Sequence, residues 1–251
     1  MPTHTYLVSI SSITRHTLVS GYIKGTKMEK INRKGVIQQK VGGVAALYLA
    51  LAYLAAMPYF LIVVDYPGAI TSRDKVVLIL GNFPSMYAMY LVTYVLFGLL
   101  LGVLALALYD RLRIHAPVVM RIATAIGLLW ASTLVASGMV FNYGMGVIVA
   151  LAEIDLVQAQ QTWQAIEPVA MGLGGAGGEL LGGLWVLLVS SVALRSGSLP
   201  KLLDWLGIVI GVAGLVSVIP VLHDVGMVFG ILQILWLVWL GVVLLTTKQT
   251  N

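Results

Sequence analysis

The chain has 251 residues, of which 59% are hydrophobic and only 10% charged, whereas a soluble domain carries about 25% charged residues, so the composition excludes a water-soluble globular protein. The absence of cysteine excludes disulfide bonds and iron–sulfur clusters. The formal net charge is +5, but the cations flank apolar segments instead of gathering in one patch. We therefore expect the lipid bilayer as a partner and no nucleic acid.

Residues 1–40 form a basic N-terminal segment that is predicted to be cytoplasmic. Seven of the fifteen Lys and Arg residues lie there. No continuous apolar core precedes a small-residue cleavage site, so no cleaved signal peptide is predicted. Met28 is a second candidate for the first residue of the protein, in which case residues 1–27 are an upstream extension.

Six apolar runs follow this segment. About 20 apolar residues span the roughly 30 Å hydrocarbon core as a helix, and only internally hydrogen-bonded backbone is tolerated there. The sequence therefore predicts an all-α, polytopic membrane bundle of six transmembrane helices, with a short tail at residues 247–251. The predicted helices cover residues 41–64, 85–108, 117–141, 168–194, 200–219 and 225–245.

Prolines mark several of the predicted helix boundaries. Pro117, Pro168 and Pro200 each precede an apolar run and suit the first turn of a helix, where the missing N–H costs nothing. Pro58 lies inside the first run and predicts a kink there. Pro220 directly follows the fifth run and closes it.

Two shorter helices are predicted outside the six runs. Thr71 and Asp74 have the spacing of a capping box, so a surface helix is expected over residues 76–80, before residues 81–84 break it. The connection over residues 142–167 contains a helix with one apolar face, formed by Leu156, Ala159, Trp163 and Ile166. This second helix either closes a site as a lid or only covers the bundle.

The distribution of cations predicts that both termini are cytoplasmic. With the N-terminus inside, thirteen of the fifteen Lys and Arg residues lie on the cytoplasmic side, and Arg73 and Lys75 lie outside. The connection over residues 142–167 has no Lys or Arg and carries three acidic residues. We therefore expect a multi-pass protein with N-in, C-in topology.

Glu179 is the ionisable residue that the membrane prediction has to explain, because it lies in a glycine-rich stretch of the fourth apolar run. A charged side chain at such a depth costs roughly 2.5 to 3.5 kcal/mol and faces the bundle interior or water. The helix rise places Glu179 roughly 12 to 16 Å below the outer surface, and Gln233 of the sixth run at a similar depth. Glu179 is then either a proton-relay or ligand-binding carboxyl, or a protonated structural residue bonded to Gln233 or a serine.

Tyrosines gather in the outer halves of the first two runs. Tyr90 and Tyr94 are four residues apart on the second run, and Tyr59 lies on the first. Together with Asn142 they predict a polar, aromatic region that converges on Glu179 and binds a ligand. An aromatic belt at the membrane interface explains part of this set without any ligand.

The glycine-rich stretch is not a phosphate-binding loop, because it lacks the Gly-Lys-Ser/Thr ending and lies in an apolar run. Gly174, Gly178 and Gly182 recur every four residues, as do Gly207 and Gly211 in the fifth run. Such steps let a second helix approach closely, within the chain or in a homo-oligomer. A broken helix that lines a cavity, as in transporters, is the alternative.

No catalytic or metal-binding motif is recognisable in the sequence. His115 and His223 would lie at opposite membrane faces, so they do not ligate one haem or zinc ion, and no cofactor is predicted. Neither His-Glu-x-x-His nor Gly-x-Ser-x-Gly is present. This argues against the hydrolases that use those motifs.

Two segments of the C-terminal third carry a family resemblance. They read Gly197-Ser-Leu-Pro-Lys-Leu-Leu-Asp-Trp-Leu-Gly207 and Phe229-Gly-Ile-Leu-Gln-Ile-Leu-Trp236. Over residues 35–246 the chain resembles the uncharacterised bacterial membrane proteins grouped as domain of unknown function 4386 (DUF4386). The resemblance implies a six-helix bundle in a prokaryotic cytoplasmic membrane and supplies no catalytic residue.

Three functions stay open at this point. In the first, the protein is transporter-like or binds a small molecule, lipid or proton in an outer-half pocket formed by Glu179, Gln233 and the tyrosines. In the second, it is a structural or assembly protein that docks a partner through the glycine-rich helix faces. In the third, the least supported because no nucleophile and base are paired, it is a membrane-embedded lipid-modifying enzyme.

Overall fold

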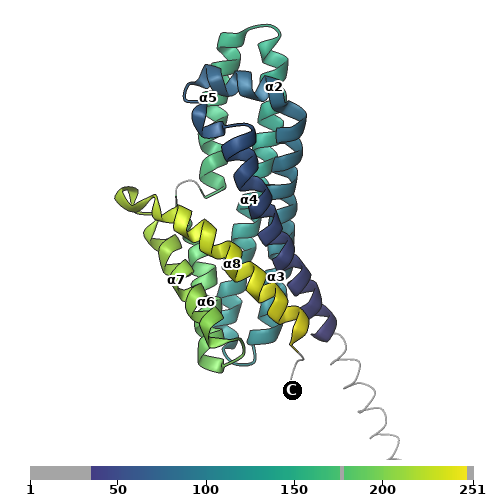
Figure 1. The fold of residues 1–251 in the computed structure, drawn as a ribbon, viewed down its shortest axis with the longest axis vertical. Coiled ribbons are helices and arrows are strands. Elements are labelled where there is room, and N and C mark those ends of the chain that lie inside the picture. Colours follow the sequence, from purple (N-terminus) through teal and green to yellow (C-terminus); the bar gives the residue numbers. More distant parts are fainter. Residues whose placement is uncertain (1–34, 176–177, 248–251) are drawn as a thin grey trace, which may run out of the picture. The chain divides into compact units, whose positions relative to one another are not determined.

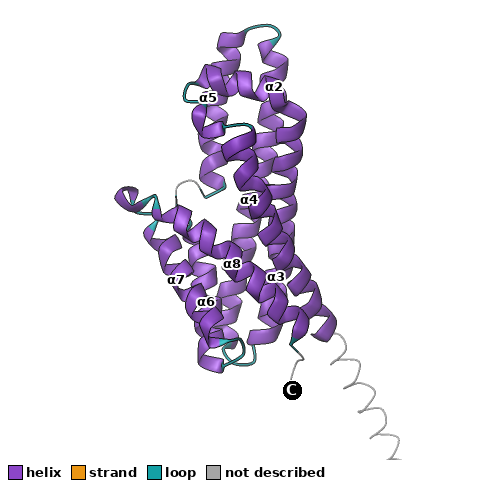
Figure 2. Cartoon of the chain, in the orientation of Figure 1, coloured by secondary structure: helices purple, strands orange, loops and turns teal. Residues whose placement is uncertain are grey.

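The computed structural model describes residues 35–175 and 178–247. The predicted start at Met28, most of the basic N-terminal segment and residues 248–251 of the tail lie outside the described residues. The described residues form helices and no strand, which confirms the all-α prediction (Figure 2). Residues 39–247 make up one compact unit, and all of the side-chain contacts below lie within it.

The helices follow one another as labelled in Figure 1. The first, Gly35–Val63, ends in a π-helical turn, η1 (Tyr59–Val63), and the 3-10 turn η2 (Tyr66–Gly68) follows. One continuous helix then combines α2 (Ser72–Tyr90), the π-helical segment η3 (Leu91–Leu96) and α3 (Phe97–Leu112). The remaining elements are α4 (Pro117–Ala152), α5 (Leu156–Leu173), α6 (Leu180–Ser196), α7 (Lys201–Val216), η4 (Pro220–Leu222) and α8 (Val225–Thr246).

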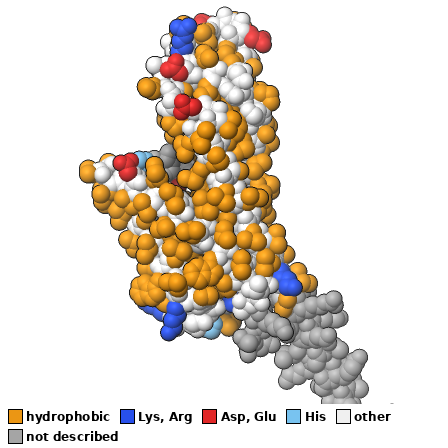
Figure 3. Space-filling model, in the orientation of Figure 1, with side chains coloured by type: hydrophobic (Ala, Val, Ile, Leu, Met, Phe, Trp, Pro, Cys, Tyr) orange, Lys and Arg blue, Asp and Glu red, His pale blue; other side chains and the backbone are white. Residues whose placement is uncertain are grey.

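Four of the helices are long and apolar enough to cross a membrane, namely Gly35–Val63, Ser72–Leu112, Pro117–Ala152 and Val225–Thr246. They coincide with the first, second, third and sixth predicted runs. The fifth run corresponds to α7, which has 16 residues, and α6 is an apolar helix of 17 residues. Figure 3 shows charged side chains toward the ends of the helices and hydrophobic side chains over the surface between them, as expected of a membrane protein.

The prediction of one helix over residues 168–194 is wrong. α5 ends at Leu173 and α6 begins only at Leu180. Between them Gly175 and Gly178 have φ angles of +100° and +114°, a backbone conformation that an L side chain rarely adopts. The glycine-rich stretch therefore interrupts the helix, which is the alternative that its low helix propensity left open.

α5 begins earlier than the proline rule predicted. Pro168 lies inside the helix and not at its start, because the helix is capped thirteen residues earlier by Asp155. The Asp155 carboxylate accepts hydrogen bonds from the backbone N–H groups of Val157 and Gln158, at 2.9 and 3.1 Å. The helix predicted from its apolar face is confirmed as the first part of α5, with Ala159 and Trp163 fully buried.

α2 and α4 are both longer than predicted. The capping box of Thr71 and Asp74 is confirmed, but the helix that it opens continues through residues 81–84 instead of breaking there. The Asn82 side chain donates to the Leu78 carbonyl at 3.0 Å, and burial of α2 residues against α4 and α5 outweighs the local helix breakers. α4 likewise runs beyond residue 141 to Ala152, because its last turns pack on α5.

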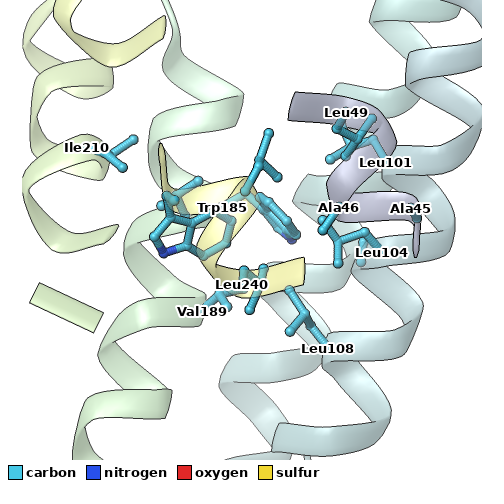
Figure 4. Packing of buried hydrophobic residues seen from close by; sticks show 14 of the residues in the cluster. Ala45, Ala46, Leu49, Leu101, Leu104, Leu108, Trp185, Val189, Ile210 and Leu240 are labelled. Atoms are coloured by element: carbon cyan, nitrogen blue, oxygen red, sulfur yellow. The ribbon is translucent and has the colours of Figure 1, made fainter. Parts of the chain in front are cut away.

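Buried hydrophobic side chains form two clusters. The α6–α8 core joins the first helix, α3, the first part of α4 and helices α6 to α8 (Figure 4), and it includes Ala46, Leu49, Leu104, Trp185 and Leu240. The α5 core joins α2, the second part of α4 and α5, and it includes Ile79, Met86, Met145, Trp163 and Ala170. Tyr94 packs against both cores.

Candidate functional site

A cavity of about 330 Å³ lies where the two cores meet, and we call it the aromatic cavity. The first helix, the turn after it, α2, η3, α3, α4, α5 and the break before α6 all contribute to its wall. The lining residues are Ala52, Tyr53, Ala56, Phe60, Leu61, Tyr66, Pro67, Tyr90, Thr93, Tyr94, Phe97, Leu134, Phe141, Met171, Gly174 and Glu179. Segments from five helices therefore converge on one site.

Two π-helical segments border the aromatic cavity. η1 supplies Phe60 and Leu61, and η3 supplies Thr93 and Tyr94. η1 directly follows Pro58, whose missing N–H interrupts the regular helical hydrogen bonds. Such widened turns are costly and occur frequently at functional sites. The presence of two π-helical segments on one cavity wall indicates a functional role for this part of the fold in addition to packing.

The cavity wall is an array of aromatic rings in mutual contact. Tyr90 stacks on Phe141 with ring centroids 4.3 Å apart and an interplanar angle of 17°. Tyr90 also contacts Phe60 at 5.1 Å and Tyr94 at 5.6 Å. Because each ring is held by its neighbours, the wall is preorganised and loses little side-chain entropy when a ligand binds.

Glu179 enters the aromatic cavity from the break between α5 and α6. Its backbone N–H donates to the Ser217 hydroxyl at 3.0 Å, and that hydroxyl donates to the Gly214 carbonyl at 2.7 Å, so α7 anchors the backbone of Glu179. A Cβ atom at Gly175 would lie 2.9 Å from the Glu179 Oε1 atom. Because glycine has no Cβ atom, Gly175 leaves room for the carboxyl group of Glu179.

Glu179 is the only charged residue among those that line the aromatic cavity. Among the described residues the ion pairs are Lys75 with Glu167 and Arg113 with Asp110, and Glu179 belongs to neither. A carboxyl group without a cationic neighbour, beside a cavity in an apolar protein, is available to a ligand or a proton.

A small polar network lies beside the aromatic cavity at Tyr66. The Lys75 ammonium group lies 2.6 Å from Glu167 Oε1, and the Tyr66 hydroxyl donates to the same oxygen at 2.7 Å. The Lys75 ammonium group also lies 5.4 Å from the centre of the Tyr66 ring. Burial, together with the hydrogen bond to Glu167, raises the pKa of the Tyr66 phenol. The network ties the turn η2 to α2 and α5.

The predicted ligand-binding residues separate into those that reach the aromatic cavity and those that do not. Glu179, Tyr90 and Tyr94 line it together. Tyr59 instead donates its hydroxyl to the Ser85 hydroxyl at 2.7 Å, which links the first helix to α2. Asn142 is buried with both amide atoms unpartnered, and it lines a different depression beside Tyr87 and Tyr143.

The predicted hydrogen bond between Glu179 and Gln233 is not formed. Gln233 is fully buried in α8, and its amide oxygen and nitrogen have no partner among the described residues. The prediction placed both residues inside continuous helices at equal depth. The interruption before Leu180 instead places Glu179 at the start of α6, where it lines the aromatic cavity.

The predicted packing glycines contact helices of the same chain. Gly182 packs on Trp130 and Phe229, Gly207 on Ser190 and Trp236, and Gly211 on Leu187. Gly174 and Gly178 lie outside the helices, where Gly174 packs on Ser137 and Tyr94, and Gly178 on the backbone of Val218. These surfaces are therefore occupied without a second copy of the chain.

Sequence reasoning missed Asp204 as a buried acidic side chain. It is 1% exposed in the first turns of α7, and neither carboxylate oxygen has a partner. The Ser190 hydroxyl and the Trp236 indole N–H, which meet at Gly207, are also unpartnered. The signal was present in the sequence, because Asp204 precedes Gly207 and Gly211 by three and seven residues and so lies on their packing face.

Sequence reasoning also missed Tyr53 and Thr93, which line the aromatic cavity. The only signal for them was helical spacing, because Thr93 lies three residues after Tyr90 and Tyr53 lies three residues before Ala56. Among the described residues no group of three His, Asp or Glu side chains is placed to hold a metal ion. No protein-family model, curated protein or solved structure matches the chain.

Proposed function

We propose that this protein is a multi-pass protein of the prokaryotic cytoplasmic membrane that binds a small molecule in the aromatic cavity, as a transporter or a ligand-binding membrane protein does. The observation that carries the proposal is the position of Glu179, a lone carboxyl group on the wall of a 330 Å³ aromatic cavity. Ligand sites are concave, mostly apolar and provided with few polar groups. The aromatic cavity has each of these properties.

The broken helix supports a transporter-like role in particular. Transporters place substrate sites where membrane helices are discontinuous, because backbone without regular hydrogen bonds is tolerated there only beside protein or a cavity. The segment from Gly174 to Glu179 is such an interruption, with η1 and η3 as further irregular turns on the same wall.

The proposal includes six membrane spans, with both termini in the cytoplasm. In addition to the four long helices, α6 and α7 would cross as a shorter pair; their 17 and 16 residues correspond to about 24 to 26 Å of helix. α4, with 36 residues, is about 54 Å long and extends beyond the hydrocarbon core. The cationic α3–α4 and α6–α7 connections support the cytoplasmic side. Membership of DUF4386 remains part of the proposal.

Binding and uptake measurements on two variants test the proposed function. Ala56→Phe adds a ring to the cavity wall, and we expect it to abolish binding of small aromatic molecules and their uptake into proteoliposomes. Glu179→Gln removes the carboxylate while keeping the shape of the side chain. Glu153→Gln, which changes an exposed carboxylate at the end of α4, is the matched control. Wild-type binding in both cavity variants, with the fold intact, would overturn the proposal.

A further inference from the structure

We infer that the ligand of the aromatic cavity is a hydrophobic organic cation, and this inference rests on the proposed function that the cavity binds a small molecule. The geometry that supports it is the juxtaposition of one carboxyl group with seven aromatic rings and no cationic side chain. The rings belong to Tyr53, Phe60, Tyr66, Tyr90, Tyr94, Phe97 and Phe141.

The charge of the wall selects against anions. Glu179 is the charged residue of the lining, and among the described residues no Lys, Arg or His lies on it. An anionic ligand would lie beside a carboxylate in a medium of low dielectric constant, where repulsion between like charges is strong. A cationic ligand compensates the carboxylate, whereas beside a neutral ligand the carboxyl group is neutralised by a proton instead.

The aromatic rings favour the same charge. The face of an aromatic ring attracts a cation, and desolvated cation–ring contacts are worth roughly 2 kcal/mol. The protein already forms one such contact at the edge of the cavity, where the Lys75 ammonium group lies 5.4 Å from the centre of the Tyr66 ring. Tyr66 is itself part of the lining.

Hydrogen-bond donors on the wall are partly occupied. The Thr93 hydroxyl donates to the Met89 carbonyl at 2.7 Å, and the Tyr66 hydroxyl donates to Glu167 at 2.7 Å. The hydroxyl groups of Tyr53, Tyr90 and Tyr94 have no partner among the described residues, and a phenol oxygen also accepts a hydrogen bond from an ammonium group. A zwitterionic lipid headgroup also carries an ammonium group, but its phosphate would find no cation on this wall.

Isosteric probes decide the question with the wild-type protein in nanodiscs. Phenyltrimethylammonium and tert-butylbenzene have the same shape and differ in charge, and benzenesulfonate supplies the anion. Ligand-detected NMR should show phenyltrimethylammonium binding about tenfold more tightly than tert-butylbenzene, with no binding of benzenesulfonate. Glu179→Gln should reduce the tenfold preference to the part that the aromatic rings supply, Glu179→Asp should retain most of it, and Glu153→Gln should leave it unchanged.

The outcomes separate this inference from the proposed function. Equal or tighter binding of tert-butylbenzene, or binding of benzenesulfonate, would overturn the cation inference. If Ala56→Phe abolished the binding of these probes, the cavity would still be a binding site. If Ala56→Phe changed the binding of none of the probes, the proposed function would be overturned as well. A preference for the cation that is undiminished in a folded Glu179→Gln protein would contradict the part of the inference that rests on Glu179, because the carboxylate would not contribute to it.

Discussion

Two acidic side chains, Glu179 and Asp204, lie among the apolar helices in different surroundings. Glu179 lines a cavity of about 330 Å³ at an interruption between helices. Asp204 is 1% exposed on the packed face of α7, with both carboxylate oxygens unpartnered. Asp204 is buried, whereas Glu179 is partly buried. Space beside the group, which a ligand requires, distinguishes Glu179 from Asp204.

The difference arises from how glycines are used in the two places. At Gly183 the backbones of α6 and α7 approach so closely that a Cβ atom would lie 2.9 Å from Gly214 and from the Gly211 carbonyl. One turn from Asp204, a Cβ atom at Gly207 would likewise meet the Ser190 side chain, so α6 and α7 also pack closely there. Gly175 and Gly178 instead lie where one helix ends and the next begins. The aromatic cavity lies beside this interruption.

The largest expected effect concerns the α6–α7 contact. We expect Gly183→Ala to lower the free energy of unfolding by about 3 kcal/mol, because the new methyl group meets backbone that cannot move aside. Unfolding in mixed micelles with increasing sodium dodecyl sulfate measures the change. Gly230→Ala is the control, since a Cβ atom there meets no atom within 4 Å. Equal stability of the two variants would show that the tight contact is not needed.

The next effect concerns the polar network beside the aromatic cavity. Glu167→Gln removes the carboxylate charge that Lys75 and Tyr66 share and keeps only a neutral amide oxygen as their acceptor, and we expect a loss of about 2 kcal/mol in unfolding free energy. Binding of phenyltrimethylammonium should weaken as the turn η2 loosens. Asp110→Asn, which removes the exposed pair with Arg113 at 3.5 Å, should change stability by less than about 0.5 kcal/mol. A larger loss in Asp110→Asn than in Glu167→Gln would contradict this assignment.

The smallest effect is expected at Asp204. A buried carboxyl group without a partner costs stability, so Asp204→Asn should leave the free energy of unfolding unchanged or raise it by about 1 kcal/mol. Probe binding should equal that of the wild type, in contrast with Glu179→Gln. If Asp204→Asn reduced binding or uptake in a folded protein, Asp204 would be a functional group, and the distinction between the two acids would fail.

Much of the candidate site was predictable from spacing and composition. Tyr90 and Tyr94 were identified from one helical turn of spacing, and Glu179 from an acidic residue within an apolar run. Tyr59, Asn142 and Gln233 were grouped with them because equal depth was the only criterion that a sequence offers. Depth does not specify direction. Tyr59 donates to Ser85, Gln233 is fully buried in α8, and Asn142 lines a different depression.

The amino-acid sequence by itself determined the all-α class, the apolar helices long enough to cross a membrane and the starts of α4, α7 and α8, because apolar run length, capping residues and prolines act over a few neighbouring residues. The tertiary structure decided whether the glycine-rich stretch continues as a helix, how far α2 and α4 extend, and which acidic residue faces a cavity. Those outcomes depend on contacts between segments far apart in the chain, such as Ser217 with Glu179 and α5 with α4. Local propensities at these positions are too small to oppose such packing.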